Sequence, residues 1–268
     1  MINNKFKCID SHCHIYPTKI ANLARNHTDK FYSVKSKHGG TVEDLIENGC
    51  RDGVDKFIVQ SVATTPHQVK SINEFIKKEV DLFPNYLVGL GTAHPESEDY
   101  IGDIDHLISL GLRGIKVHPD IQNFDADDSR FMKIFEYMQE KNLTLLMHAG
   151  DSRYDHSNPN RIIPILKAFP KLTVVGAHFG GWSIWDTASK ELCNFSNFYV
   201  DTSSSLAYLT ERSVKEIILR YGIDKVMFAS DYPMWGAKDD IQRLLNLGFS
   251  DSDYEKLFYK NAEKVFKI

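Results

Sequence analysis

The chain repeats one pattern along nearly its whole length, in which a short apolar segment is followed by an amphipathic one. The apolar segments are rich in Val, Ile, Leu and Phe, and several begin just after Gly, Asn or Pro, as buried parallel strands do. They are FKCID (6–10), DKFIVQSV (55–62), YLVGLGTA (86–93), LRGIKVHP (112–119), LTLLMHAG (143–150), LTVVGAHF (172–179), FYVDTS (198–203) and KVMFASD (225–231). Eight strand–helix repeats in one chain predict an α/β fold, a single (β/α)8 TIM barrel.

The segments between these strands have helical character. Residues 41–50 offer Thr41 as an N-cap, and residues 66–80 carry an apolar stripe. No Gly/Ser/Pro-rich linker or shift in composition divides the chain, so we expect one domain over residues 1–268. The polar stretch 18–40 after the first strand is long for a loop in such a barrel. An insertion of this kind is typical of a lid or a substrate-side wall.

Composition narrows the function classes. The 268 residues carry a formal net charge of -4, which gives no electrostatic reason to expect nucleic acid or an anionic membrane as a partner. No apolar run is long enough to cross a bilayer, and the N-terminal residues lack the apolar core of a signal peptide. The four cysteines form no C-x-x-C pair, so we expect a reduced, cytoplasmic protein. An aromatic content of 12% leaves room for a homodimer face.

The motif IDSHCHIYP, at the end of the first strand, holds an acid and two histidines at alternate positions. In an extended strand Asp10, His12 and His14 share one face, and Ser11 and Cys13 take the other. Two imidazoles on one face can grip a metal ion, whereas strand alternation excludes Cys13 as a ligand.

Titratable residues also close the other strands. In a TIM barrel the loops after the strands build the active-site face. For a single histidine at such a position, ordinary hydrogen bonding is at least as good an explanation as metal ligation. Gathering many titratable groups at one partly desolvated end of the barrel, however, costs free energy unless a ligand binds them. A divalent cation would bind these groups, and imidazoles with one carboxylate suit a single Zn²⁺, with Mn²⁺ or Fe²⁺ as alternatives. The strand ends carry His12, His14, Lys116, His118, His148, His178, Asp201 and Asp231.

The ordered set of motifs resembles the amidohydrolase superfamily. IDSHCHIYP, LMHAG, GAHFGG and MFASDYP, with NAEKVF near the C-terminus, are similar to the branch that includes aminocarboxymuconate-semialdehyde decarboxylase and related decarboxylases, hydratases and metal-dependent hydrolases. The resemblance implies a metal held by His12, His14, His148 and Asp231. It places His178 close by, as a weak ligand or as a group that orients water or polarises the substrate.

Lys116, on the fourth strand, has three interpretations. It is an ammonium that binds an acidic substrate, a carboxylated lysine that bridges two metals as in two-metal members of the superfamily, or a lysine that reaches solvent. We favour the ammonium, because the branch matched by the other motifs is mostly mononuclear.

The resemblance implies a metal-dependent hydrolase that uses an activated water on an ester, lactone or amide bond of a small carboxylated molecule. Asp231 would carry the proton and His178 would stabilise the developing oxyanion. Asp10 would support the ligands through a hydrogen bond. The alternative is a metal-dependent, non-oxidative decarboxylase or hydratase of an acidic aromatic or dienoic compound. The substrate-binding candidates are Lys116, His118, Arg153, Trp182 and Tyr232.

Two further classes compete with these enzymes. A metal-dependent deoxyribonuclease of the TatD type shares H-x-H but has a glutamate where this chain has Lys116, and the acidic charge balance disfavours it. A non-catalytic, metal-stabilised barrel that binds a partner would need a closed coordination shell. For Trp182 and Trp235, packing against the barrel rim explains the residue as well as substrate contact does.

Overall fold

The computed structural model describes residues 5–268, so the first four residues of the predicted domain lie outside the described part. Every strand segment falls in a region where the sequence predicts one, and each paired neighbour runs parallel. The first strand runs through both histidines to His14, as the alternation of Asp10, His12 and His14 requires. The strands are β1 (Ile9–His14), β2 (Lys56–Gln60), β3 (Leu87–Gly89), β4 (Gly91–Thr92), β5 (Gly114–Val117), β6 (Thr144–Met147), β7 (Thr173–Gly176), β8 (Phe198–Asp201) and β9 (Val226–Met227).

The strands form a ring whose two seams are bridged by backbone hydrogen bonds. β3 pairs with β2 and β4 pairs with β5, and only Leu90 separates the two halves of this strand. At the other seam the amide of Ser11 donates to the carbonyl of Phe228 (3.1 Å), and the amide of Asp231 donates to the carbonyl of His12 (3.1 Å). The predicted (β/α)8 barrel is therefore confirmed.

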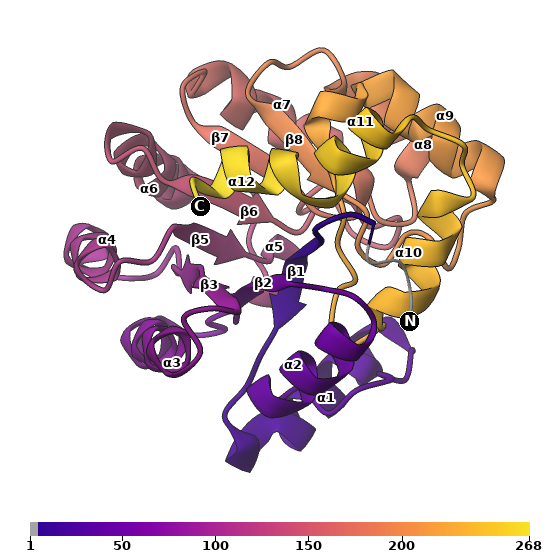
Figure 1. The fold of residues 1–268 in the computed structure, drawn as a ribbon. Coiled ribbons are helices and arrows are strands. Elements are labelled where there is room, and N and C mark those ends of the chain that lie inside the picture. Colours follow the sequence, from indigo (N-terminus) through magenta and orange to yellow (C-terminus); the bar gives the residue numbers. More distant parts are fainter. Residues whose placement is uncertain (1–4) are drawn as a thin grey trace.

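Helices surround the strands on the outside (Figure 1). The side chain of Thr41 caps its helix by accepting from the amide of Asp44, as predicted. Among the described residues no helix has both the length and the apolar character needed to span a membrane. The helices are α1 (Thr18–Tyr32), α2 (Val42–Arg51), α3 (Val69–Leu82), α4 (Tyr100–Ser109), α5 (Pro119–Gln122), α6 (Ser129–Glu140), α7 (Pro159–Ala168), α8 (Trp185–Leu192), α9 (Glu211–Tyr221), α10 (Ala237–Leu245), α11 (Asp251–Glu255) and α12 (Asn261–Phe266).

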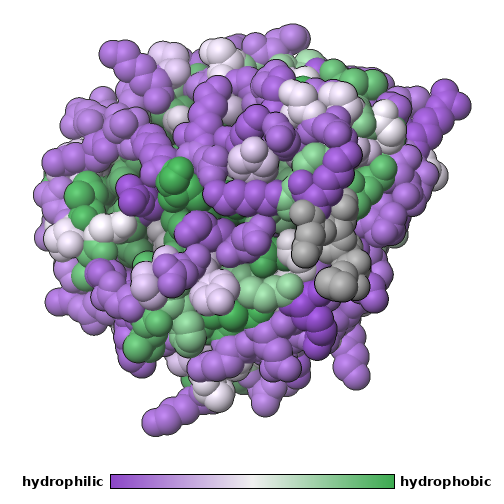
Figure 2. Space-filling model, viewed as in Figure 1, coloured by the Kyte–Doolittle hydropathy of each residue, from purple (hydrophilic) through white to green (hydrophobic). Residues whose placement is uncertain are grey.

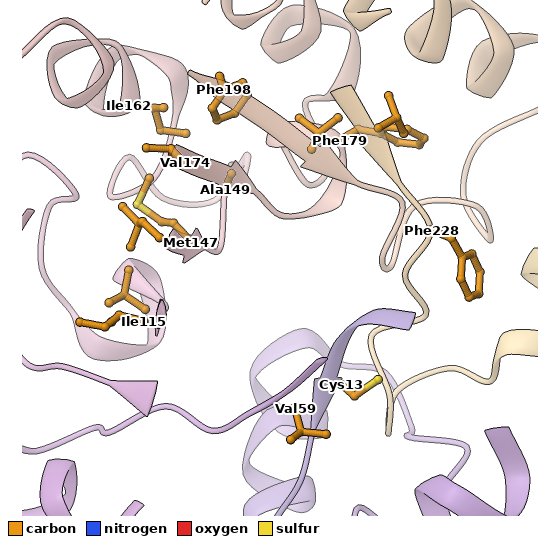
Figure 3. Packing of buried hydrophobic residues seen from close by; sticks show 14 of the residues in the cluster. Cys13, Val59, Ile115, Met147, Ala149, Ile162, Val174, Phe179, Phe198 and Phe228 are labelled. Carbon is orange, nitrogen blue, oxygen red and sulfur yellow. The ribbon is translucent and has the colours of Figure 1, made fainter. Parts of the chain in front are cut away.

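Strand alternation divides the apolar residues into two clusters. One lies inside the barrel, where Ile9, Ile58 and Met227 meet Phe266 of α12, which crosses one end of the strands (Figure 1). The other lies between strands and helices, and Figure 3 shows Cys13 in it beside Val59. Cys13 therefore faces away from the barrel interior, which agrees with its exclusion as a metal ligand. The face seen in Figure 2 is largely hydrophilic, with hydrophobic residues between the charged ones.

The insertion after the first strand contains a helix. Residues 18–32 form α1, which ends where Ser33 adopts a left-handed backbone (φ 55°). The amide of Tyr16 donates to the carbonyl of Gly40 (2.9 Å), which joins the two ends of the insertion. Tyr32 and Val34 line the cleft described below, so the insertion forms part of the wall of that cleft.

Candidate metal centre

The two histidines of β1 meet the aspartate that follows β9. Their Nε2 atoms lie 3.1 Å apart. Oδ1 of Asp231 is 3.3 Å from Nε2 of His12 and 3.7 Å from Nε2 of His14. The ligand atoms of these three residues all lie within 4.8 Å of one another. Residues more than two hundred positions apart in the chain are thus brought to one point by closure of the barrel.

Two further imidazoles adjoin this group. Nε2 of His178, after β7, lies 3.0 Å from Nδ1 of His148, after β6. The rings of His178 and His12 stack with centroids 5.4 Å apart. The four predicted ligands (His12, His14, His148 and Asp231) and His178 therefore form one continuous cluster, as the strand-end argument predicts.

The hydrogen-bond network fixes which ring nitrogen of each histidine faces this cluster. Carbonyl oxygens only accept, so Nε2 of His148 donates to the carbonyl of Gly150 (3.0 Å) and Nδ1 of His178 donates to the carbonyl of Ser203 (2.9 Å). In each neutral ring the other nitrogen then carries a lone pair, and these two lone pairs face each other.

Burial keeps His14, His148 and His178 neutral. It lowers the pKa of His178 to about 4, and it lowers the pKa of His14 and His148 well below the usual range. Opposed lone pairs on neutral, buried imidazoles repel each other, whereas a cation among them turns each one into a ligand. The residues present therefore fit a divalent metal ion.

Asp201, the last residue of β8, holds the histidine at the centre of the cluster. Its Oδ2 lies 2.9 Å from Nδ1 of His12, and both side chains are fully buried. Its Oδ1 accepts from the backbone amide of His178 (2.9 Å). Burial alone would raise the pKa of Asp201, but the neighbouring imidazoles and the hydrogen bonds from His12 and Ser203 lower it, so the carboxylate stays charged. A carboxylate on Nδ1–H directs the Nε2 lone pair of His12 to the metal position.

Two residues of the cluster adopt a left-handed backbone that non-glycine residues rarely use. The φ angle is 59° at His178 and 67° at Asp231. Each such residue costs on the order of 1–3 kcal/mol and persists only where the surroundings impose it. The hydrogen bonds from these two backbone amides, to Asp201 and to the carbonyl of His12, hold the strained segments in place.

Lys116 points into the cluster from β5. It is fully buried, and its Nζ lies 3.1 Å from Nε2 of His12. Burial lowers its pKa to about 8. Within residues 5–268 no carboxylate lies within salt-bridge distance of this ammonium. The structure thus excludes a lysine that reaches solvent, and it places the amine of Lys116 beside the proposed ligands.

A narrow cleft leads to the cluster. Ser204 donates to Oδ2 of Asp231 and accepts from the indole N–H of Trp235 (3.0 Å), which ties the aromatic wall to the proposed ligand set. Trp182 also lines the cleft. The lining residues are Tyr32, Val34, His148, His178, Trp182, Ser204, Tyr208, Asp231, Met234 and Trp235.

Two of the predicted substrate contacts are engaged elsewhere. The guanidinium of Arg153 binds the buried carboxylate of Asp151 (Nη2 to Oδ2, 2.7 Å), so its charge is already paired. The hydroxyl of Tyr232 donates to Oδ2 of Asp44 (2.7 Å) and accepts from the amide of Gly40 (3.0 Å), which anchors the insertion. Neither residue lines the cleft, and Lys116 and His118 lie behind its lining residues.

His118 lies next to the cluster with Asp120. His118, Asp120 and His148 satisfy the distances of a second metal site. However, the rings of His118 and His148 are stacked in parallel, with centroids 3.9 Å apart and 6° between their planes. A metal ion lies close to the plane of each imidazole that binds it, and parallel planes share no such position. We therefore assign the candidate metal centre to His12, His14 and Asp231 in preference to this trio.

Three residues of the site have no role that the sequence predicts, namely Asp201, Ser204 and Tyr32. Asp201 was visible as an acid at a strand end, which was its signal. Ser204 lies in the run of serines after that strand, and its contact with Asp231 had no sequence signal. Tyr32 lies in the insertion, where only the structure shows which of its side chains enters the cleft.

Comparison with known proteins gives a family and a fold. A family model described as "Amidohydrolase" matches residues 9–268. An uncharacterised TIM-barrel protein from Bordetella bronchiseptica is similar with a TM-score of 0.80 and 17% identity, over 98% of this chain and 99% of that one. The 5-carboxyvanillate decarboxylase LigW from Sphingomonas paucimobilis is similar with a TM-score of 0.76 and 17% identity, over 98% of this chain and 100% of that one.

A third solved structure carries ligands. It is a dihydroxybenzoic acid decarboxylase from Polaromonas sp. JS666 with bound manganese and the inhibitor 2-nitroresorcinol. The TM-score is 0.74 and the identity 14%, over 98% of this chain and 97% of that one. At such identities the three structures establish a shared barrel fold.

Proposed function

This chain belongs to the amidohydrolase family, and from that premise we propose that it is a metal-dependent, non-oxidative decarboxylase of a small acidic aromatic or dienoic compound. One observation carries the proposal. At the base of an aromatic-lined cleft, the lone pairs of several buried imidazoles face one another beside the carboxylate of Asp231. The decarboxylases among the structurally similar proteins support it. The sequence alone favoured hydrolysis, and these comparisons favour the alternative that it also allowed.

The proposed metal ligands are His12, His14, His148 and Asp231, with His178 beside them. A bound divalent cation would act as a Lewis acid toward a substrate oxygen. Manganese is bound in the decarboxylase from Polaromonas. We therefore propose one ion, Mn²⁺ or Zn²⁺, in this chain, since imidazole and carboxylate ligands accept both.

Lys116 and the tryptophans would bind and orient the substrate. The buried ammonium of Lys116 lacks a carboxylate partner among the described residues, and an anionic substrate group supplies one. Trp182 and Trp235 line the cleft and can hold a flat ring between apolar surfaces. Once such a ring fills the narrow cleft it excludes water, which strengthens each of these electrostatic contacts.

Asp231 is the proposed proton carrier. In this reaction the bond from the ring carbon to the carboxyl group breaks, CO₂ leaves, and the carbon gains a proton. Asp231 lines the cleft. Burial raises its pKa, but His12, His178 and His14 outweigh burial and lower it, so Asp231 is a carboxylate that must take up a proton before it passes one to carbon. That proton must come from a hydroxyl group of the substrate or from water.

Product analysis tests the proposal. The purified protein, loaded separately with Mn²⁺ and Zn²⁺, is offered 2,6-dihydroxybenzoate, 5-carboxyvanillate and a set of lactones, and CO₂ release and ring opening are followed. We expect CO₂ from at least one aromatic acid, and none with Asp231→Asn at equal metal content. Ring opening of lactones without CO₂ release would replace the proposal with hydrolysis.

A further inference from the structure

We propose that Tyr32, carried into the cleft by the insertion, donates a hydrogen bond to an anionic oxygen of the substrate, and that His118 is the positioning residue that leaves this hydrogen free. The inference rests on the proposed function, because it assigns a substrate contact in the same cleft. It also gives the insertion a chemical role beyond that of a wall.

Tyr32 is the last residue of α1 and lines the cleft with His148, His178 and Asp231. Its hydroxyl oxygen lies 2.7 Å from Nε2 of His118 and 3.5 Å from Nε2 of His148. Its ring packs edge-on against Trp182, with centroids 5.1 Å apart. The hydroxyl is therefore held between two imidazoles at the edge of the proposed metal centre.

The direction of these hydrogen bonds follows from the backbone around His118. The amide of Ile121 donates to Nδ1 of His118 (3.2 Å), so that nitrogen carries a lone pair. A ring nitrogen that accepts a hydrogen bond carries no hydrogen, so the ring is neutral. Its one hydrogen is then on Nε2, and it is donated to the oxygen of Tyr32.

Neither imidazole can accept the hydrogen of Tyr32. Nε2 of His118 is a donor, and Nε2 of His148 donates to the carbonyl of Gly150. Within residues 5–268 the hydroxyl makes no other hydrogen bond. The phenol hydrogen therefore has no acceptor among the described side chains, and a carboxylate or phenolate oxygen in the cleft supplies one.

Arg153 secures the position of Tyr32. Its Nη1 donates to the carbonyl of Phe31 (2.8 Å), while Asp151 holds the other side of the guanidinium. The guanidinium carbon lies 5.0 Å from the ring centroid of Phe31 and 5.4 Å from those of Tyr32 and Trp182. Arg153 therefore fastens the end of α1 to the rim of the cleft, where the sequence predicted a substrate contact.

The tautomer of His118 can be measured without any substrate. In zinc-loaded, ¹⁵N-labelled protein, long-range ¹H–¹⁵N spectra distinguish Nε2–H from Nδ1–H rings, and His118→Gln identifies the signal. We expect the Nε2–H tautomer, with the signal shifted in Tyr32→Phe. An Nδ1–H tautomer would make Tyr32 the donor to His118 and would overturn the inference.

Binding of 2-nitroresorcinol tests the contact itself. Tyr32→Phe keeps the ring and removes only the hydroxyl, and we expect the variant to bind the probe roughly ten- to a hundredfold more weakly. Tyr154→Phe is the matched control, because Tyr154 is 41% exposed, lies at the same rim and does not line the cleft. Unchanged affinity in Tyr32→Phe overturns the inference about Tyr32. Failure of every protein, wild type included, to bind the probe instead contradicts the proposed function.

A double-variant cycle separates positioning by His118 from a general structural effect. His118→Leu removes the N–H that Tyr32 accepts, and we expect it to weaken probe binding by a factor similar to that of Tyr32→Phe. The double variant should bind the probe no more weakly than either single variant. The reason is that each substitution already removes the hydrogen bond between His118 and Tyr32. Fully additive losses would mean that the two residues act independently, and the positioning role would be lost.

Discussion

Oδ2 of Asp201 lies 2.9 Å from Nδ1 of His12, and neither side chain is exposed to solvent. This contact joins the end of β8 to the first strand across the barrel. It gives His12 a fixed tautomer, with the Nε2 lone pair facing His14 and Asp231. The direction of this lone pair therefore depends on Asp201, a carboxylate that is not itself a proposed metal ligand.

Replacing Asp201 with Asn should weaken metal binding. The amide has nearly the same shape but lacks the charge and can turn its NH₂ toward Nδ1, which disfavours the required tautomer. We expect an affinity about ten- to a hundredfold lower, measured by competition with a chromogenic chelator. Asp224→Asn is the control, because the side chain of Asp224 is 67% exposed. Equal metal affinities of the two variants would contradict a role for Asp201 in directing the lone pair of His12.

Metal binding should stabilise the folded protein. Because the inward-facing ring nitrogens gather only in the fold, an added ion binds the native state and raises its Tm with concentration. Chelator-treated protein should show this rise with Mn²⁺ or Zn²⁺, and His14→Ala should lose most of it. His27→Ala, which alters an exposed histidine of α1, should respond like the wild type. An identical response from His14→Ala would contradict the proposed ligand set.

Lys116→Met should separate stability from binding. In the metal-free protein, burial lowers the pKa of Lys116 from 10.5 to about 8, so the folded state disfavours the charged form. The charged form therefore destabilises the fold below pH 8, by roughly 3 kcal/mol, and this cost disappears as the pH rises toward 10.5. We expect the variant to unfold at an equal or higher temperature at pH 7. Its affinity for 2-nitroresorcinol should fall at least about tenfold, and retained affinity would refute the role of an anion anchor.

Asp240, on α10, should make stability depend on pH. Burial raises its pKa from 3.8 to about 7, so between these values the folded state binds more protons than the unfolded state. The free energy of unfolding therefore falls as the pH rises from about 4 to 7. Asp240→Asn should flatten this dependence and be the more stable protein at pH 8, as measured by urea unfolding. Asp239→Asn, on the exposed side of the helix, should keep the wild-type dependence.

The barrel was predictable because its signals are local. A short apolar run predicts each strand segment. The alternation of His12, Cys13 and His14 already places the cysteine outside the barrel and the histidines inside it. Parallel strands then gather their carboxyl ends at one face whatever the loops contain. The clustering of His12, His14, His148, His178 and Asp231 follows from the sequence for this reason.

No comparable periodicity predicts where side chains in the loops point, and some substrate contacts predicted there are not found. Arg153 and Tyr232 lie next to strand ends, yet one binds Asp151 and the other anchors the insertion. Both outcomes depend on partners that local periodicity does not specify.

The sequence by itself thus determined the order of strands, the family and the identity of the residues at the barrel mouth. Only the tertiary structure decided which nitrogen of each imidazole faces inward, that His118 stacks on His148, and that Tyr32 reaches the cleft. The physical reason is that a side chain's side of a strand is set by its own backbone. Its tautomer and its hydrogen-bond partners are set by groups such as Asp201 that lie far away in the chain and near in space.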